Sequence, residues 1–359
     1  MDVFDRIGAD DYEQVVFCHD RVSGLRAIVA VHSTRLGPAL GGTRFYPYPS
    51  EAAGLEDVLR LARGMTYKAA AAGLDLGGGK AVIFGDPARD KTEALLRAYA
   101  RHVDNLGGRY LTAEDVGTTQ ADMDVVRKET RFVTGVSREL GGSGDPSAAT
   151  AYGVLWAMKA VALHLWGDTS LSGRHVALAG VGKVGAALLG HLVTEGARVS
   201  VADVTPAAVE RAVTEAGAEA IGVEKIHAVG CDIYAPCALG GALSAETIPE
   251  LRCAAVVGSA NNQLADGAAS ARLLAEAGVL YAPDFVANAG GLINIAEELA
   301  PGGYHPDQAL AAVRRIFDTV TSVLQAAEVG GVTTAEAADR RAETRIAALS
   351  AVHHIRPPG

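Results

Sequence analysis

The sequence predicts two α/β domains, an N-terminal domain with a mixed sheet and a second domain with a doubly wound parallel sheet, with a cleft between them. The chain has 359 residues, of which 49% are hydrophobic. A chain of this length and composition is too long for one ordinary hydrophobic core and long enough for two packed domains. A Gly-rich passage at 141–147 breaks the pattern. After it, short apolar runs alternate with helical segments, which is typical of a parallel sheet. We expect residues 1–140 and about 332–359 to form the first domain and residues 141–331 the second.

Two β-like runs open the first domain, from Gln14 to Cys18 and from Leu25 to Val31. The turn-rich segment between them predicts a hairpin. Helical patterns follow at 50–72, 91–106 and 119–128, with short strands at 81–84 and 110–112. A hairpin followed by alternating helices and strands predicts a mixed sheet.

A helical stretch from Ala148 to His164 leads the second domain. The apolar runs expected to form its parallel strands lie at 176–179, 199–202, 233–235, 255–258 and 279–282. The segment from Thr333 to Ala348 has Ala, Arg and Glu at helical spacing, and we expect it to pack back onto the first domain. The glycines of 141–144 are placed to act as a hinge.

Composition narrows the class of function. The net charge is -10 and Lys and Arg form no long basic run, so nucleic acid and anionic membranes are not expected partners. The N-terminus lacks a secretion signal and no apolar run approaches the ~20 residues of a membrane span, which predicts a cytoplasmic protein. The four cysteines form no Cys-x-x-Cys pair and are expected to be free thiols. No histidine spacing predicts a metal site.

A Gly-x-Gly-x-x-Gly turn, Gly180-Val181-Gly182-Lys183-Val184-Gly185, stands between an apolar strand and a helical pattern. Gly180 permits the tight turn, Gly182 lets the backbone approach a pyrophosphate, and Gly185 lets helix and strand pack closely. Asp203 ends the next strand, where a carboxylate binds the ribose 2′-hydroxyl and repels a 2′-phosphate. The pattern predicts a Rossmann-type site for NAD rather than NADP, with Lys183 and Val184 in the binding turn. The alternative is that the glycines only form a turn and Asp203 caps the helix near Pro206.

Three polar side chains are candidates for catalysis: Lys68, at the end of a helical run, Lys80, after three glycines, and Asp115, after a short strand. The triglycine does not fit a phosphate loop, because Leu74 replaces its first glycine and Ala81 its hydroxyl residue. We expect a loop that brings the backbone close to a small ligand and aims Lys80 into a cleft. Taken singly, each lysine could be a solvated surface charge and the aspartate a turn residue.

Several motifs, taken together and in this order, resemble the family of glutamate, leucine, phenylalanine and valine dehydrogenases from about Gln14 to Arg345. They are Gly37-Pro38-Ala39-Leu40-Gly41-Gly42-Thr43-Arg44, Met65-Thr66-Tyr67-Lys68, Gly77-Gly78-Gly79-Lys80, Asp115-Val116-Gly117-Thr118, Pro236-Cys237-Ala238-Leu239-Gly240-Gly241, Ala260-Asn261-Asn262 and Asn288-Ala289-Gly290-Gly291. The resemblance implies that Lys68 binds the substrate α-carboxylate, Lys80 is the catalytic lysine and Asp115 transfers protons at the amino group. It also places Thr150 and Asn261 near the nicotinamide carboxamide. The substrate-binding residues it implies include Gly41, Gly42, Met65 and Ala113.

The chemistry of amino-acid oxidation suits these assignments. Hydride leaves Cα for the nicotinamide, and water then attacks the imino carbon, so a neutral amine is needed as base. A second cation in a water-poor cleft favours a neutral lysine, so Lys68 is expected to help Lys80 act as that base. Asp115 can carry a proton to and from the substrate nitrogen. The expected reaction is reversible, NAD-dependent oxidative deamination to a 2-oxo acid and ammonia by a homo-oligomeric enzyme.

The resemblance also bears on which amino acid is oxidised. The resemblance implies that Leu40 occupies the position at which glutamate dehydrogenases carry a lysine that pairs with the side-chain carboxylate of glutamate. Leucine offers no such charge, so glutamate should be a very poor substrate. Leu292 and Ile295 stand where leucine dehydrogenases carry valines, and the larger side chains favour valine or 2-aminobutyrate.

Two alternatives stay open. One is a leucine dehydrogenase of broad aliphatic specificity. The other is a non-catalytic NAD-binding regulatory protein, which would be expected to lack Lys80 or Asp115. An NAD(P)-linked enzyme with another substrate gives no reason for the paired lysines.

Overall fold

The computed structural model describes residues 3–350, which form two compact units. The first unit comprises the chain up to Asp145, residues 295–306 and the chain from Ala342, and the second comprises Pro146–Asn294 and Asp307–Arg341. This division differs from the expected one chiefly at 295–306, which belong to the first unit, and at 332–341, which belong to the second. Glu298 of the segment 295–306 accepts hydrogen bonds from the backbone nitrogen atoms of Gly135 and Ser143, at 3.0 and 2.8 Å, which explains why this segment belongs to the first unit.

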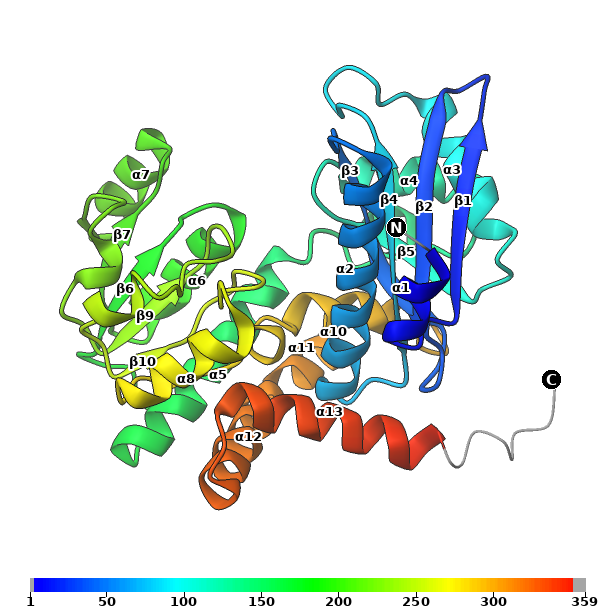
Figure 1. The fold of residues 1–359 in the computed structure, drawn as a ribbon. Coiled ribbons are helices and arrows are strands. Elements are labelled where there is room, and N and C mark those ends of the chain that lie inside the picture. Colours follow the sequence, from blue (N-terminus) through cyan, green and yellow to red (C-terminus); the bar gives the residue numbers. More distant parts are fainter. Residues whose placement is uncertain (1–2, 351–359) are drawn as a thin grey trace. The chain divides into compact units, whose positions relative to one another are not determined.

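The first unit is built on a five-stranded mixed sheet with the order β1-β2-β4-β3-β5 (Figure 1). The strands are β1 (Gln14–Asp20), β2 (Leu25–Ser33), β3 (Ala39–Tyr46), β4 (Gly77–Phe84) and β5 (Tyr110–Glu114). β2 pairs antiparallel with β1 and β4, whereas β3 pairs parallel with β4 and β5. The expected hairpin and mixed sheet are therefore confirmed.

Helices cover both faces of this sheet. They are α1 (Val3–Ala9), α2 (Glu51–Ala71), α3 (Glu93–Asp104) and α4 (Gln120–Val126). Val58 and Ala62 of α2 pack with Val82 of β4 on one face. Leu96 of α3 and Met123 of α4 join the core on the other face. Ser50 caps α2 by accepting a hydrogen bond from the Ala53 nitrogen, which fixes the start of this helix.

Two features of this sheet differ from the sequence-based expectation. Strand β3 was not predicted, because glycines interrupt its apolar run. The three glycines before Lys80 were expected to form a loop, but they form the first part of β4, so that prediction was wrong. A Cβ on Gly78 would lie 2.1 Å from the Thr66 nitrogen, and one on Gly79 would lie 2.7 Å from the Tyr110 ring. The glycines let α2 and the neighbouring strands approach β4 closely.

The second unit contains an all-parallel six-stranded sheet with the order β11-β10-β9-β6-β7-β8. Its strands are β6 (His175–Ala179), β7 (Arg198–Ala202), β8 (Glu219–Ala220), β9 (Ile233–Pro236), β10 (Ala255–Val256) and β11 (Leu280–Tyr281). The chain crosses from β6 through one helix to β7 and through another to β8, and then returns to β9 beside β6. This order is the doubly wound topology that the sequence predicts.

The helices of the second unit and the C-terminal part of the described chain are as follows: α5 (Ser147–Trp166), α6 (Lys183–Thr194), α7 (Pro206–Ala216), α8 (Gly267–Glu276), α9 (Asp284–Ala287), α10 (Gly290–Ala296), α11 (Pro306–Arg314), α12 (Ile316–Gly330) and α13 (Thr334–Ser350). Helix α13 confirms the helical pattern expected at 333–348. Its residues Ala342 and Ile346 pack with Leu36 and Ala70 of the first unit, as expected for that part of the segment.

Helix α5 corrects one expectation. Its 20 residues make it the one helix of the described chain that is long and apolar enough to cross a membrane by length and composition. The expectation that no apolar segment approaches this length was therefore wrong. In this structure α5 packs against α6 and α12, and residues such as Val154, Met158 and Val161 are completely buried. It is the core helix of the second unit.

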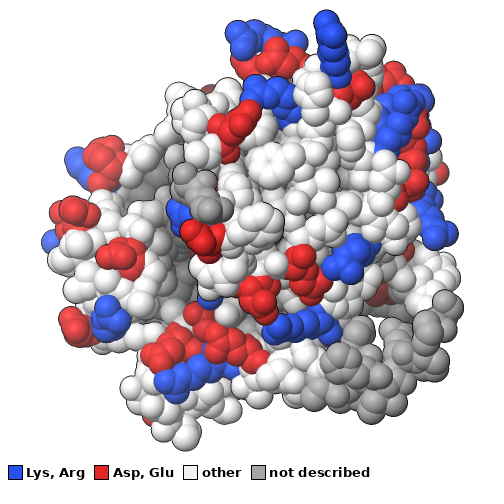
Figure 2. Space-filling view, turned by 45° about the vertical axis from the view of Figure 1, so that its right-hand side comes forward, with Lys and Arg blue, Asp and Glu red and all other residues white. Residues whose placement is uncertain are grey.

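Charged side chains of both signs are interspersed on the face displayed in Figure 2. Exposed side chains of the protein also form ion pairs, such as that between Arg26 and Glu51 at 2.7 Å. Exposed pairs of this kind contribute little to stability. The displayed face gathers neither sign into one broad patch.

Candidate functional site

One face of the sheet in the first unit carries the candidate catalytic lysine. Alternate side chains of a strand point to the same face. Val82 packs on the α2 side of β4, so Lys80 points to that side as well. In the parallel ladders, Leu40 of β3 lies beside Gly78 of β4 and Leu111 of β5, so the alternation also places Leu40 and Ala113 on the α2 side.

Helix α2 supplies the predicted substrate-binding residues Met65 and Lys68. A Cβ on Gly41 would lie 3.4 Å from the Met65 side chain, which places Met65 over β3. Lys68 lies one turn further along and therefore on the same side of the helix, in its last turn. Both residues are partly buried. The first unit thus brings together α2 and the strand positions that the sequence analysis selected.

Lys80 and Asp115 form an ion pair in which the lysine Nζ lies 3.0 Å from the aspartate Oδ2. The Lys80 side chain is only 7% exposed, which is unusual for lysine and excludes the solvated surface charge considered from the sequence. Asp115 directly follows β5. Burial raises the pKa of its carboxyl, but the neighbouring Lys80 and Arg44 outweigh burial and hold the pKa below its ordinary value. Asp115 is therefore a carboxylate near neutral pH.

Arg44 is a member of this site that the sequence analysis quoted in a motif but gave no role. Its Nε lies 3.0 Å from the same Oδ2 of Asp115, and its Nη1 lies 2.8 Å from Oδ2 of Asp57. The Tyr48 hydroxyl donates to that Asp57 oxygen at 2.6 Å. The alternation of side chains along β3 places Arg44 on the same face of the sheet as Lys80. This alternation could have revealed Arg44 from the sequence only if β3 had been recognised as a strand.

Close packing of glycines positions this network. A Cβ on Gly41 would lie 1.7 Å from the Gly79 oxygen. One on Gly42 would lie 2.4 Å from the Glu114 oxygen and 2.9 Å from the Asp115 Cβ. A side chain at Gly41 would displace the backbone that precedes Lys80, and a side chain at Gly42 would displace the backbone that carries Asp115. The structure thus gives Gly41 and Gly42 a packing role, and contact of either with substrate stays a prediction.

Buried hydroxyl groups brace the other face of the same strands. The Thr43 Oγ1 lies 2.6 Å from both the Tyr99 hydroxyl and the Thr112 Oγ1. The Tyr110 hydroxyl donates to the Gly41 oxygen at 2.6 Å. Burial raises the pKa of Tyr110 to about 12, so this donor keeps its proton at physiological pH. Satisfied buried networks of this kind rigidify the strands that carry a site.

The Gly-x-Gly-x-x-Gly turn of the second unit lies between β6 and α6, as the sequence predicts. Gly180 has a φ of 102°, a conformation that favours glycine. A Cβ on Gly185 would lie 2.0 Å from the Gly180 oxygen, so the third glycine permits the close packing of α6. Gly182 precedes α6, and a Cβ there would meet open space. Lys183 and Val184 begin the helix, whose N-terminus suits a pyrophosphate.

Asp203 joins this turn to the end of β7. Its Oδ2 accepts from the Val181 nitrogen and its Oδ1 from the Thr205 nitrogen, each at 2.8 Å. Slight burial raises the pKa of Asp203, but these backbone hydrogen bonds outweigh burial and lower it. Thr205, not Asp203, is the N-cap residue of α7, so the helix-cap alternative does not hold. Asp203 lies in the wall of a cavity of about 330 Å³ with Gly180, Val204 and Tyr234.

Of the remaining predicted residues, Thr150 lies in α5, Leu292 and Ile295 lie in α10, and Asn261 lies between β10 and α8. Asn261 Oδ1 accepts from the Asn288 Nδ2 at 2.8 Å, and Thr150 Oγ1 donates to the Pro146 oxygen at 3.0 Å. Leu292 is buried in the second unit, whereas Ile295 is partly buried and belongs to the first. These contacts hold the side chains in place, and their roles toward cofactor and substrate stay predictions.

Comparison with known proteins identifies the family. Residues 12–132 match the Glu/Leu/Phe/Val dehydrogenase dimerisation domain, and residues 204–353 match the Glutamate/Leucine/Phenylalanine/Valine dehydrogenase domain. The chain is 53% identical to leucine dehydrogenase of Bacillus cereus over 349 residues, covering 97% of this chain and 94% of the relative. The chain belongs to the Glu/Leu/Phe/Val dehydrogenase family.

Other members agree with this placement. Valine dehydrogenase of Streptomyces coelicolor is 54% identical over 340 residues, which cover 94% of this chain and 92% of that one. The crystal structure of L-tryptophan dehydrogenase from Nostoc punctiforme has a TM-score of 0.85 at 42% identity, covering 97% of this chain and all of that one. The resemblance, the fold class and the assignment to the amino-acid dehydrogenases are therefore confirmed. The identities to leucine and valine dehydrogenases are too similar to separate those two specificities.

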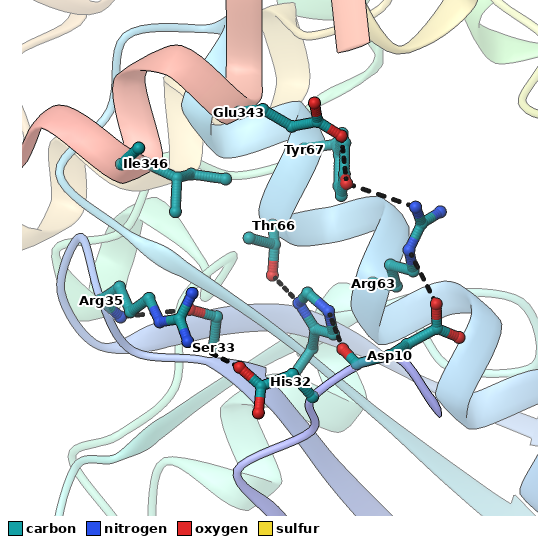
Figure 3. Close-up of a pocket in the computed structure, with 11 residues that line it drawn as sticks. Asp10, His32, Ser33, Arg35, Arg63, Thr66, Tyr67, Glu343 and Ile346 are labelled. Carbon is teal, nitrogen blue, oxygen red and sulfur yellow. Dashed lines mark hydrogen bonds and ion pairs between the residues drawn. The ribbon is translucent and has the colours of Figure 1, made fainter. Parts of the chain in front are cut away.

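The first unit of this dehydrogenase also contains a polar pocket of about 310 Å³ on another side of α2 (Figure 3). His32 lies at its centre, with Nδ1 2.8 Å from the Thr66 Oγ1 and Nε2 3.1 Å from the Asp10 oxygen. Burial lowers the pKa of His32, so the ring is mostly neutral at pH 7. Arg63 lies 3.6 Å from the Asp10 carboxylate, and the Tyr67 hydroxyl donates to Glu343. None of the predicted site residues lines this pocket.

Proposed function

We propose that this protein catalyses the reversible, NAD-dependent oxidative deamination of a branched-chain L-amino acid, with valine preferred, to the 2-oxo acid and ammonia. The observation that carries the proposal is the buried ion pair between Lys80 and Asp115. It lies beside α2 on a sheet face that also carries Leu40. A base and a carboxylate in contact, away from bulk water, suit proton transfers at neighbouring carbon and nitrogen atoms.

In the proposed mechanism each polar residue has one task. Lys68 binds the α-carboxylate of the substrate through its ammonium group. Asp115, a carboxylate near neutral pH, accepts a proton from the substrate amino group. Lys80 in its neutral form accepts a proton from the water that attacks the imino carbon and passes it to the nitrogen. As the carbon–nitrogen bond breaks and ammonia leaves, the Lys80 amine accepts the remaining hydroxyl proton, so that the carbonyl of the 2-oxo acid is formed. Contact with Asp115 holds the Lys80 amine in place through both steps.

Bound NAD supplies the hydride acceptor. Gly180, Gly182 and Gly185, with the start of α6 at Lys183 and Val184, would hold its pyrophosphate, and Asp203 its adenosine ribose. The open space at Gly182 and the cavity beside Asp203 fit such a group. A lowered pKa keeps Asp203 charged, so its carboxylate would repel the 2′-phosphate of NADP. Thr150 and Asn261 are proposed to contact the nicotinamide carboxamide.

Substrate selection is proposed to depend on apolar side chains. Leu40 is completely buried and offers no partner for an acidic substrate side chain, so glutamate is disfavoured by several kcal/mol. Ala113, also buried, leaves room beside Asp115. Leu292 and Ile295 are proposed to favour valine because their side chains are larger than the valines of leucine dehydrogenases. One methylene is worth about 1 to 3 kcal/mol in such a pocket, so leucine should be oxidised less efficiently.

The alternative is a leucine dehydrogenase of broad aliphatic specificity, which the similarity to the Bacillus cereus enzyme favours equally. Measurements of kcat/KM for valine, leucine and 2-aminobutyrate with NAD+ separate the two. A higher value for leucine than for valine supports the alternative. We also propose a homo-oligomer, since the matched N-terminal domain is described as a dimerisation domain.

A further inference from the structure

We infer that Arg44 is a positioning residue that holds Asp115 in its reactive orientation and presents one carboxylate oxygen to the substrate. This inference rests on the proposed role of Asp115 in proton transfer. It assigns a task to a residue for which neither the sequence analysis nor the comparison with relatives gives one.

The argument begins with which oxygen of Asp115 is bound. Lys80 Nζ and Arg44 Nε both lie 3.0 Å from the same atom, Oδ2. In the part of the chain that the structure describes, Oδ1 of Asp115 forms no hydrogen bond or ion pair. Two cations on one oxygen fix the rotation of the carboxylate. The other oxygen is left as the acceptor for a proton of the substrate amino group.

Arg44 is itself held rigidly. Its Nη1 binds Asp57 at 2.8 Å, and Asp57 also accepts from Tyr48 and from Arg60. The side chains of Arg44 and Asp57 are 22% and 15% exposed, so the pairing is largely shielded from water. The planar guanidinium reaches two carboxylates at once, which a lysine ammonium at the end of a flexible stem does less well.

Removal of Arg44 has two consequences that a loss of packing alone would not produce. The Asp115 carboxylate keeps only Lys80, so it can rotate. It also loses one of the two cations that lower its pKa, so the pKa of the Asp115 carboxyl should rise. Asp115 must be ionised to accept a proton, so the acid limb of the pH profile of amino-acid oxidation should move to higher pH.

The experiment compares Arg44→Gln with Arg60→Gln. Arg60 is a matched control, since it binds Asp57 at the same 2.8 Å as Arg44 but does not contact Asp115. For Arg44→Gln we expect kcat for valine to fall about 10- to 100-fold, with a smaller change in KM. We also expect the acid limb of the pH profile of kcat to move to higher pH by about one pH unit. Arg60→Gln should keep the wild-type profile.

Arg44→Lys separates charge from geometry. It should return the acid limb of the pH profile to its wild-type position, because a cation remains beside Asp115. It should restore only part of the wild-type kcat. NAD+ binding and thermal unfolding report whether each variant is folded. If Arg44→Gln does not fold, Arg44→Lys carries the test, and a wild-type kcat in that variant overturns the inference.

Asp115→Asn distinguishes this inference from the proposed function. If Asp115→Asn retains activity, the proposed role of Asp115 is wrong whatever Arg44 does. A second outcome is that Asp115→Asn is inactive, while Arg44→Gln has the same kcat and the same acid limb of the pH profile as Arg60→Gln. In that case the proposed function stands and the inference about Arg44 is overturned.

Discussion

Replacement of Lys80 by alanine should abolish turnover without unfolding the protein. The Lys80 Nζ lies 3.0 Å from Asp115 Oδ2, and at an effective dielectric constant of 20 the gross attraction across this distance is about 5 to 6 kcal/mol. Little of it should appear as lost stability, because Arg44 remains on the same oxygen and no buried carboxylate is left unpaired. We therefore expect about 1 to 3 kcal/mol of destabilisation, mainly from lost packing.

The loss of catalysis should be larger than the loss of stability. A positioned general base contributes about 10²- to 10⁴-fold, which corresponds to about 3 to 5 kcal/mol in the activation barrier. The assay is NADH formation from valine at saturating NAD+, with NAD+ binding and urea unfolding measured on the same variant. Lys159→Ala is a matched control, because Lys159 is also shielded and pairs with Glu195 at 2.6 Å in the second unit. Wild-type kcat in Lys80→Ala, or equal losses in both variants, would refute the reasoning.

Three further predictions concern the cofactor, the substrate and pH. Asp203→Asn should lower the preference for NAD+ over NADP+ at least about tenfold in kcat/KM, since the charge that would repel a 2′-phosphate is lost; an unchanged ratio contradicts the ribose assignment. Leu40→Ala should raise kcat/KM for leucine relative to valine about 5- to 100-fold, and should cost about 2 to 5 kcal/mol of stability because Leu40 is fully buried. Burial raises the pKa of Glu298 above its ordinary value, so its protonated form stabilises the fold at low pH and this stability is lost as pH rises through the folded-state pKa. Urea unfolding should therefore show Glu298→Gln to be more stable relative to wild type at pH 7 than at pH 4, and a constant difference would show that Glu298 does not titrate in this way.

Local sequence signals predict the second unit well. Its strands are short apolar runs between helical segments, and the Gly180 turn follows β6 as the spacing requires. Each glycine in the turn has a local reason, such as the φ of 102° at Gly180. Only β8, which is two residues long and exposed, has no comparable signal.

The first unit is less predictable, because its critical features depend on contacts distant in sequence. Gly41 and Gly42 weaken β3 as a strand pattern, yet they are required by the Gly79 and Glu114 backbones that approach them. The three glycines at 77–79 weaken the start of β4 as a strand pattern in the same way, so from the sequence they look like a loop. Once β3 is missed, Arg44 cannot be placed beside Lys80.

Hydrogen bonds between distant parts of the chain and burial explain two other differences. Glu298 is bound by Ser143, 155 residues earlier in the chain, so no local pattern assigns residues 295–306 to the first unit. Helix α5 is apolar on most sides because other helices surround it, and composition alone does not separate such a helix from a membrane span.

The most direct test of the proposed function is an initial-rate assay of the purified protein with NAD+ across a panel of L-amino acids. We expect valine to give the highest kcat/KM, leucine and 2-aminobutyrate lower values, and glutamate a value lower by at least about 100-fold, because no cation at Leu40 meets its side-chain carboxylate. A preference for glutamate, or no NADH formation from any branched-chain amino acid, would contradict the proposal.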